Sequence, residues 1–222
     1  MTIVLIDADS IIYKAGFSNE ERLYHVLYKE SPVIPFVSVR YISEVKDIIK
    51  DSEDFFFEKE IRIGPVQNAL HSAKKIIASI KDSCKCNNIT VVLSSPGKTL
   101  KHSIAKTAEY KGNRDPEAKP KQYKELREYL EKYYNAISYD GYEADDLIGT
   151  LARQATEQKM DAVILSGDRD LMQLVNHHVK LMTPIVGVTK TVLYDENAVY
   201  ARFGLWPHEF IDYKALIGDA SD

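Results

Sequence analysis

The sequence has few cysteines and no long apolar stretch, and these absences narrow the class of protein. Only Cys84 and Cys86 occur among 222 residues. They lie too close together for an ordinary disulfide, and no further Cys or His pair completes a zinc site. No apolar run approaches the roughly 20 residues that span a bilayer, and the first residues lack a charged flank followed by a cleavage site. We therefore expect a cytoplasmic protein without a membrane segment, whose cysteines are reduced and structural.

Histidine is missing from the places where hydrolytic chemistry often uses it. None of the six histidines lies beside the acidic motifs described below. This argues against a zinc hydrolase, and it leaves a Ser-His-Asp or Cys-His pairing without support.

An overall positive charge is absent too, since the chain sums to −4. The charge is nevertheless unevenly distributed, because the segment from Lys98 to Lys124 sums to +5 and the remainder to −9. Such a division suits a protein that binds phosphate with one part and metal with another. The basic residues of this segment are Lys98, Lys101, Lys106, Lys111, Arg114, Lys119, Lys121 and Lys124, against the acidic Glu109, Asp115 and Glu117.

Apolar runs alternate with helical periodicity along most of the chain, which indicates an α/β fold with a mainly parallel sheet covered by helices on both faces. In the segment at about 19–64, proline and mixed charge break the pattern, and its structure stays open. Expected strands are 2–6, 89–93, 161–165, 179–183 and 191–194, and expected helices begin near Ser10 and span 66–83, 121–134, 143–158, 169–175 and 210–217.

Acidic residues gather in four groups at the ends of apolar runs or the starts of helices. Each group alone fits a helix cap, which Asp favours. Asp7 and Asp168 both follow strands, however, and ligands gather where parallel strands end. Carboxylates crowded on one rim repel each other unless cations neutralise them, and hard divalent ions take oxygen ligands. The groups are Asp7 with Asp9, Glu143 with Asp145 and Asp146, Asp168 with Asp170, and Asp219 with Asp222.

The run Glu109–Asp115 combines an aromatic ring and two cations around a Gly-Asn step. Lys111 can meet a phosphate as a point charge, Arg114 by a bidentate fork, and Tyr110 can stack on a base. The alternative is a solvated surface loop.

Taken together and in order, these motifs resemble the 5′-nuclease (flap endonuclease) family. The likeness is to bacteriophage 5′-3′ exonucleases and to the 5′-nuclease domain of bacterial DNA polymerase I. The motifs that carry it are Asp7-Ala8-Asp9-Ser10, Tyr110-Lys111-Gly112-Asn113-Arg114, Gly141-Tyr142-Glu143-Ala144-Asp145-Asp146, Ser166-Gly167-Asp168-Arg169-Asp170 and Ile217-Gly218-Asp219-Ala220-Ser221-Asp222.

The resemblance implies one PIN-like catalytic domain over residues 1–222, with a basic helical arch at about 95–134 through which a 5′ single strand threads. The part at about 95–121 is expected to be mobile. Two Mg²⁺ ions, replaceable by Mn²⁺, would cut DNA near a 5′ flap or 5′ end and leave a 5′-phosphate and a 3′-hydroxyl.

The family pattern also assigns roles to individual residues. Lys111 and Arg114 would act on the scissile phosphate as catalytic cations. The first metal would take Asp7, Glu143 and Asp145, with Asp146 outside them, and the second Asp168, Asp170 and Asp219, with Asp222 as a further candidate. Residues expected to contact DNA are Lys98, Lys101, Lys106, Tyr110, Lys111, Arg114, Lys119 and Lys121.

The chain departs from the family pattern at two places. Ser94 or Ser95 stands where relatives carry another Asp after a strand, and no acid occurs from Thr90 to Ala108. Asp9 could make up part of the missing charge, or it could only cap the following helix. The second departure is the end at Asp222, where relatives continue into a helix-hairpin-helix element that holds duplex DNA. We expect that element to be absent or cut short.

Three other functions remain open at this stage. A haloacid-dehalogenase-like phosphatase would use Asp7 and Asp9, but its later acidic motif is spaced differently. A catalytically weak protein that binds flap DNA would bind in a salt-sensitive way without turnover. A PIN-type ribonuclease stays possible because backbone contacts alone do not distinguish RNA from DNA.

Overall fold

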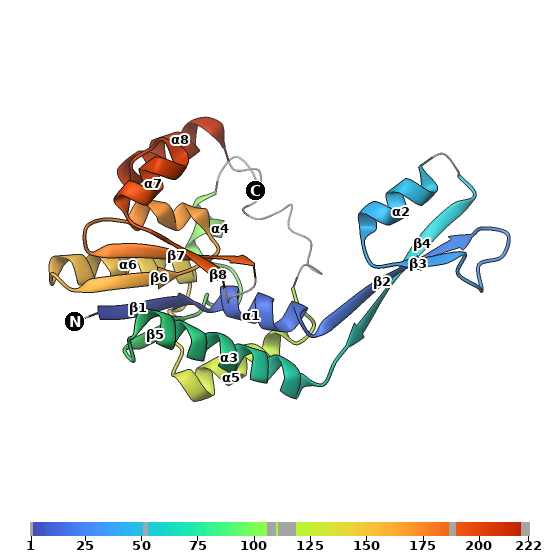
Figure 1. Cartoon of the computed structure of the whole chain (residues 1–222), viewed down its shortest axis with the longest axis horizontal. Coiled ribbons are helices and arrows are strands. Elements are labelled where there is room, and N and C mark those ends of the chain that lie inside the picture. Colours follow the sequence, from blue (N-terminus) through green and yellow to red (C-terminus); the bar gives the residue numbers. More distant parts are fainter. Residues whose placement is uncertain (1, 51–52, 106–109, 111–118, 187–189, 219–222) are drawn as a thin grey trace.

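The computed structural model describes residues 2–50, 53–105, 110, 119–186 and 190–218. The described chain forms two regions that differ in shape (Figure 1). We call residues 20–63 the arm, because they project from one side of the molecule, and the remaining described residues the body. The arm begins where helix α1 ends and returns to the body at helix α3.

The body is built on a five-stranded sheet in the order β5-β1-β6-β7-β8. Strands β5, β1, β6 and β7 run parallel to their neighbours, and only the edge strand β8 is antiparallel, so the expected mainly parallel sheet is confirmed. Apolar, β-branched runs form these strands because both faces of the sheet are covered. The strands span β1 Thr2–Asp7, β5 Ile89–Val92, β6 Asp161–Leu165, β7 Val179–Val186 and β8 Lys190–Tyr194.

Helices cover both faces of this sheet (Figure 1). One face packs against α1 (Ala8–Phe17), α3 (Val66–Cys84) and α5 (Tyr123–Tyr134). The buried residues of α3 lie in this core, namely Ala69, Ala73, Ile76, Ile77 and Ile80. The opposite face packs mainly against α6 (Ala144–Glu157), and it is completed by the 3₁₀ helices η2 (Arg169–Leu174) and η3 (Pro207–Glu209) and by α7 (Glu196–Phe203) and α8 (Phe210–Ile217).

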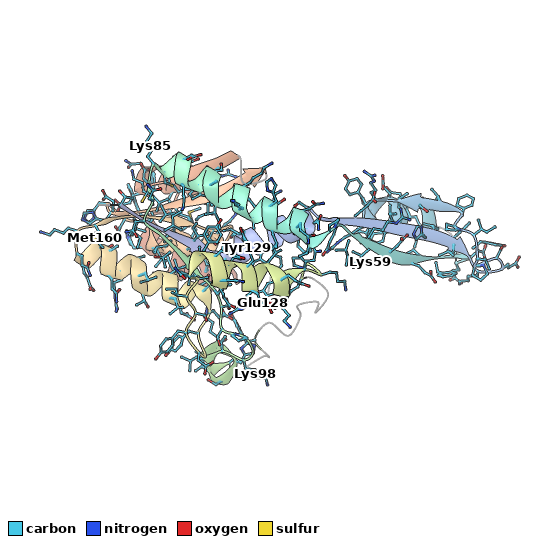
Figure 2. All side chains as sticks on the ribbon, turned by 90° about the horizontal axis from the view of Figure 1, so that it is seen from below. Lys59, Lys85, Lys98, Glu128, Tyr129 and Met160 are labelled. Carbon is cyan, nitrogen blue, oxygen red and sulfur yellow. The ribbon has the colours of Figure 1, made fainter. Side chains whose placement is uncertain are left out.

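Helix α5 lies within the segment at about 95–134 for which the sequence predicts an arch. Its Leu126 and Leu130 are fully buried in the core beside α1 and α3. A helix held in this way belongs to the body, and the arch at about 95–134 stays a prediction. The short helix α4 (Leu100–Ile104) follows β5, and Lys98 beside it lies on a projection from the body (Figure 2).

The arm is a small antiparallel sheet with one helix. Strand β2 (Glu20–Tyr28) pairs along its whole length with β4 (Phe55–Ile63), and β3 (Val37–Val39) pairs on its other side. Helix α2 (Ile42–Ile49) contributes the buried Val45. The arm closes at its base, where the Gly64 amide donates to the Asn19 carbonyl over 2.9 Å. The structure left open by the sequence is therefore an ordered β-rich projection.

The cysteines are free, as expected, and both are partly buried against the core. The Cys86 thiol donates to the Thr2 carbonyl over 3.0 Å. Burial raises the pKa of the Cys84 thiol, with a contribution from Cys86. Within the described ranges, no helix combines the length and the apolar character that a membrane crossing needs.

Candidate metal and DNA site

Asp7 stands at the carboxyl end of the interior strand β1 and is 8% exposed. Its carboxylate caps α1 by accepting from the Asp9 amide at 3.0 Å. It also accepts from the hydroxyls of Ser10 at 3.1 Å and Ser166 at 2.8 Å. Asp7 is therefore held in one orientation by neutral donors from two neighbouring segments.

Burial and neighbouring acids both disfavour the charged form of Asp7. Burial, followed by repulsion from Asp9, raises the pKa of Asp7 from 3.8 to about 7. Asp145 adds to this increase, whereas the hydrogen bonds from Ser166 and Ser10 oppose it. A buried carboxylate that is kept near like charges favours a bound cation, because a cation would restore its ordinary acidity. The electrostatics of Asp7 therefore fit a divalent metal.

Asp168 lies on the same rim as Asp7, as the sequence predicts. The strands β1 and β6 are adjacent, and Ser166, which donates to Asp7, also accepts from the Asp168 amide at 3.0 Å. The side chain of Asp168 is exposed and caps η2 by accepting from the Asp170 amide at 2.8 Å. Asp170 in turn lies 2.9 Å from the Lys214 ammonium of α8.

Glu143 is the second buried acid of the site and precedes α6. Three side chains from the segment after β5 converge on its carboxylate. The Lys101 ammonium and the Tyr110 hydroxyl each lie 2.9 Å from one oxygen, and the Thr99 hydroxyl lies 3.5 Å from the other. Because Glu143 is 4% exposed, these contacts fix it firmly and tie the α4 region to α6.

Lys101 brings a positive charge into direct contact with this acidic group. Its ammonium lies 2.9 Å from Glu143 and 3.6 Å from Asp146, whose carboxylate also accepts from the Glu143 amide at 3.0 Å. Burial by itself lowers the pKa of Lys101, but the hydrogen bond and charge of Glu143, with Tyr110 and Asp146, raise it overall. Lys101 is therefore firmly protonated.

Ser94 stands where the resembled family carries an acid, and it has a structural task here. Its hydroxyl accepts from the Ala144 amide at 3.1 Å, which satisfies an amide in the first turn of α6. The next residue, Ser95, is buried and donates to Asp140 at 3.2 Å. Ser94 thus anchors the start of α6, next to Glu143, without adding a charge.

Asp9 has a hydrogen-bond partner in α5 that the sequence did not indicate. Asp7 caps α1, so the interpretation that Asp9 only caps this helix is wrong. The Asp9 carboxylate accepts from the Tyr123 hydroxyl at 2.9 Å. Burial raises the pKa of Tyr123, and Asp9 contributes to the same direction. Asp9 also raises the pKa of Asp7, so its charge acts on the site while its oxygen is held by α5.

The predicted metal residues are brought together only in part. Asp7 is electrostatically coupled to Asp9 and Asp145. Across the described part of the chain, however, no three His, Cys, Asp or Glu side chains stand close enough to hold one ion. The predicted Lys106, Lys111, Arg114, Asp219 and Asp222 lie outside the described residues.

The predicted DNA contacts also divide into different settings. Lys98, which Figure 2 labels, is exposed on a projection from the body. Lys101 and Tyr110 instead donate hydrogen bonds to the Glu143 carboxylate. The Lys119 ammonium lies 4.7 Å from the centre of the Tyr123 ring, and the Lys121 side chain is exposed.

Sequence reasoning missed Thr99, Ser10 and Ser166 as residues of the site. The signal for Ser10 and Ser166 was their place beside acids in the Asp7 and Asp168 motifs, since a hydroxyl there can orient a carboxylate. No such local signal exists for Thr99, because its partner Glu143 is 44 residues away.

Comparison with known proteins identifies the family. Residues 2–204 match the model of the 5′-3′ exonuclease, N-terminal resolvase-like domain. The chain belongs to this family. The matched range contains Asp7, Glu143 and Asp168 as well as the whole arm.

Relatives of this 5′-3′ exonuclease domain include DNA polymerases I and a 5′-3′ exonuclease. DNA polymerase I of Chloroflexus aurantiacus is 43% identical over 132 residues, which are 57% of this chain and 14% of the polymerase. The 5′-3′ exonuclease of Buchnera aphidicola subsp. Acyrthosiphon pisum is 32% identical over 171 residues, 75% of this chain and 58% of the relative. The chain thus spans less than two thirds of the length of either relative.

Solved structures support the fold of the domain. The bacteriophage T5 flap endonuclease, in a pseudo-enzyme-product complex with DNA and metal ions, aligns with a TM-score of 0.58 and 19% identity, over 100% of this chain and 68% of that one. The T5 5′-exonuclease with bound divalent zinc ions aligns with a TM-score of 0.58 and 18% identity, over the same shares.

Proposed function

We propose that this domain is a metal-dependent 5′ nuclease that hydrolyses DNA phosphodiester bonds near 5′ ends or 5′ flaps. The observation that carries the proposal is Asp7, a buried carboxylate at the rim of the sheet whose pKa is raised by burial and by Asp9 and Asp145. The family membership supports the same conclusion. Bound divalent ions, Mg²⁺ by proposal with Mn²⁺ as a substitute, would activate a water and stabilise the leaving oxygen.

Each acid is given a proposed role. Asp7 and Asp145, with Glu143, are proposed for one ion, and Asp146 orients Glu143 from its backbone side. Asp168 and Asp170 are proposed for the other ion, together with Asp219 and Asp222 beyond the described residues. Asp9 is proposed to add negative charge from its place beside Tyr123.

The serines and Lys101 prepare this acidic site. Ser10 and Ser166 hold the Asp7 carboxylate in one rotamer, and Lys101 limits the repulsion around Glu143. Preorganised groups need little rearrangement during the reaction, which is the main way in which proteins accelerate phosphoryl transfer. The site would release a product with a 5′-phosphate and a strand with a 3′-hydroxyl.

Cleavage of a 5′-labelled flap DNA in magnesium, manganese or chelator tests the proposal. We expect cutting near the flap junction with either ion, none in chelator, and no hydrolysis of small phosphate esters. Asp145→Asn should remove the activity. Asp161→Asn is the matched control, because Asp161 is an exposed acid at the opposite end of strand β6. Equal activity of wild type and Asp145→Asn would refute the assignment.

Lys111 and Arg114 are proposed as cations on the scissile phosphate. Alanine at either position should slow cleavage far more than it weakens DNA binding, because a contact made chiefly in the transition state affects turnover. Single-turnover rates and anisotropy binding curves separate the two effects. Equal losses in rate and affinity would make these residues ground-state phosphate anchors.

A further inference from the structure

A groove lies where the arm meets the body, at the end of α1. One hollow of about 560 Å³ occupies this junction, a size within the range of small-ligand sites. A second hollow adjoins it, because both are bounded by Phe17. We call the two together the junction groove. It is lined by Tyr13, Lys14, Phe17, Ser18, Glu20, Glu21, Arg22, Arg40 and Tyr41.

Three aromatic rings line the junction groove. Tyr13 and Phe17 come from α1 and pack edge to face, with ring centroids 5.6 Å apart. Tyr41, from the arm, is 67% exposed. Unpaired nucleobases stack on exposed rings of this kind, and the interaction tolerates any base because each has a π face.

The cations of the groove outnumber its acids. Lys14, Arg22 and Arg40 face the two carboxylates of Glu20 and Glu21. Each acid is already neutralised, because Glu20 pairs with Arg22 and Glu21 with Arg40, both at 3.0 Å. The lining therefore keeps a net positive charge, which suits a phosphodiester strand.

Arg22 also contributes to stacking. Its guanidinium carbon lies 4.6 Å from the centre of the Phe17 ring, so cation and ring are prearranged on one wall of the groove. The arm as a whole is net negative, since residues 20–63 carry ten acids and seven Lys or Arg. The base of the arm combines cations with aromatic rings in a hollow.

Side-chain contacts connect the junction groove with the candidate nuclease site. Tyr13 packs against Tyr123, with ring centroids 6.1 Å apart, and Tyr123 donates to Asp9. Lys119 lies over the same Tyr123 ring, at 4.7 Å. A row of rings and cations thus leads from Asp9 along α1 to the groove.

Helix geometry sets the distance between the two sites. Asp7 caps α1 at one end and Phe17 closes its ten residues at the other. Ten residues at 1.5 Å each separate these ends by about 15 Å. A single strand that stays stacked as in duplex DNA advances about 3.4 Å per nucleotide and covers this length in roughly four or five nucleotides.

We propose that the junction groove binds the 5′ single strand of the DNA substrate, about four or five nucleotides from the bond that is cut. This inference rests on the proposed function and adds a second contact for the strand beyond the metal site. It gives the base of the arm a role in selecting substrates with long single-stranded 5′ ends.

Binding to flaps of different length tests the inference. Wild type and the double variant R40A/Y41A are titrated, by fluorescence anisotropy in Ca²⁺, with duplexes that carry thymidine flaps of two or ten nucleotides. Loss of one stacked base and one phosphate contact should weaken binding of the ten-nucleotide flap by about tenfold or more. Binding of the two-nucleotide flap should not change, because that flap does not reach the groove.

The matched control is R62A/Y133A. Arg62 is an exposed, Glu-paired arginine of the arm, and Tyr133 is an exposed tyrosine of the body, and neither lines the groove. This variant should bind both flaps like the wild type. Far-ultraviolet circular dichroism and thermal melts check that both variants fold.

The outcomes are distinct. Unchanged affinity of R40A/Y41A for the long flap would overturn the groove proposal. An equal loss of affinity for both flaps would overturn it as well, because such a loss shows a general electrostatic effect. A groove that binds a protein partner instead of DNA would likewise show no dependence of the affinity loss on flap length. Whichever of these results overturns the groove proposal, cleavage of the short flap by the wild type would leave the proposed nuclease function intact. A wild type that neither binds nor cuts either flap would overturn the nuclease function itself.

Discussion

The body and the arm obey the same chemistry but bury very different shares of their side chains. In the body, both faces of the sheet are covered, and strands such as β1 and β6 are buried on each side. The fully or nearly fully buried apolar residues of the arm are Val26, Leu27 and Val45, since one short helix covers its small sheet. The comparison shows that the hydrophobic pattern of a sequence reveals strands and helices most clearly where their side chains are deeply buried.

Charge separates the two regions as well. The arm sums to −3, yet the cations at its base face the body. The body gathers its acids at the strand ends and its cations in the segment after β5. If this division is functional, changes in the body should affect catalysis and global stability, and changes in the arm should stay local.

The largest effect is expected for Asp7→Asn. The change removes a charged ligand of the proposed metal site while it keeps the size of the side chain. Cleavage should fall by about a thousandfold or more, because metal stabilisation of the transition state is worth several kcal/mol. Single-turnover cleavage in magnesium measures the loss, and a rate within tenfold of wild type would remove Asp7 from the site.

The same variant has a consequence for stability in chelator. The pKa of Asp7 is about 7 in the folded chain against the ordinary 3.8, so the folded state binds more protons between these values. The stabilising contribution is complete below about pH 4 and is lost as the pH rises through about 7. Urea unfolding across this window should show a declining free energy for wild type and a smaller decline for Asp7→Asn. Identical profiles would contradict the raised pKa.

Paired core truncations test whether the arm is independent of the body. Leu130 is fully buried in the body and Leu27 is 4% exposed in the arm. Either change to Ala costs about 2–5 kcal/mol where the cavity forms. Leu130→Ala should lower the melting temperature of the whole protein. Leu27→Ala should accelerate hydrogen exchange only within residues 20–63. Faster exchange throughout the body in Leu27→Ala would show that the two regions unfold together.

Lys101→Met is expected to raise the affinity for metal ions, by a smaller factor than the loss of cleavage in Asp7→Asn. The Lys101 ammonium lies 2.9 Å from the Glu143 carboxylate, so it competes with a metal ion for the same negative charge. Its removal should lower the Mn²⁺ concentration at half saturation by about three- to tenfold. Electron paramagnetic resonance of free Mn²⁺ measures binding directly, with the exposed Lys98→Met as control. Weaker binding would instead show that Lys101 holds Glu143 in place for the metal.

The smallest effect is expected for Ser94→Ala. The Ala144 amide would lose its acceptor at the start of α6, which costs about 1 kcal/mol. Urea unfolding measures this loss, and Ser103→Ala serves as a control because Ser103 is exposed and bonds only within α4. Unchanged stability would mean that Ser94 is not the anchor of α6.

The sequence by itself determined the body and much of its site. Continuous β-branched runs predicted β1, β5 and β6, because a strand buried on both faces must be apolar throughout. The position of Asp7 and Asp168 after such strands placed both on one rim, since parallel strands end on the same side. The order of the short motifs carried the family resemblance, because each motif is local in the chain.

Only the tertiary structure decided the arm and the partners of the acids. The strands β2 and β4 are separated by more than twenty residues, and with one covered face their apolar pattern is weak, so the pairing was not visible in the sequence. Asp9 meets Tyr123 across 114 positions, and Lys101 meets Glu143 across 42. Local spacing carries no information on such contacts, because they depend on how helices and strands pack in space.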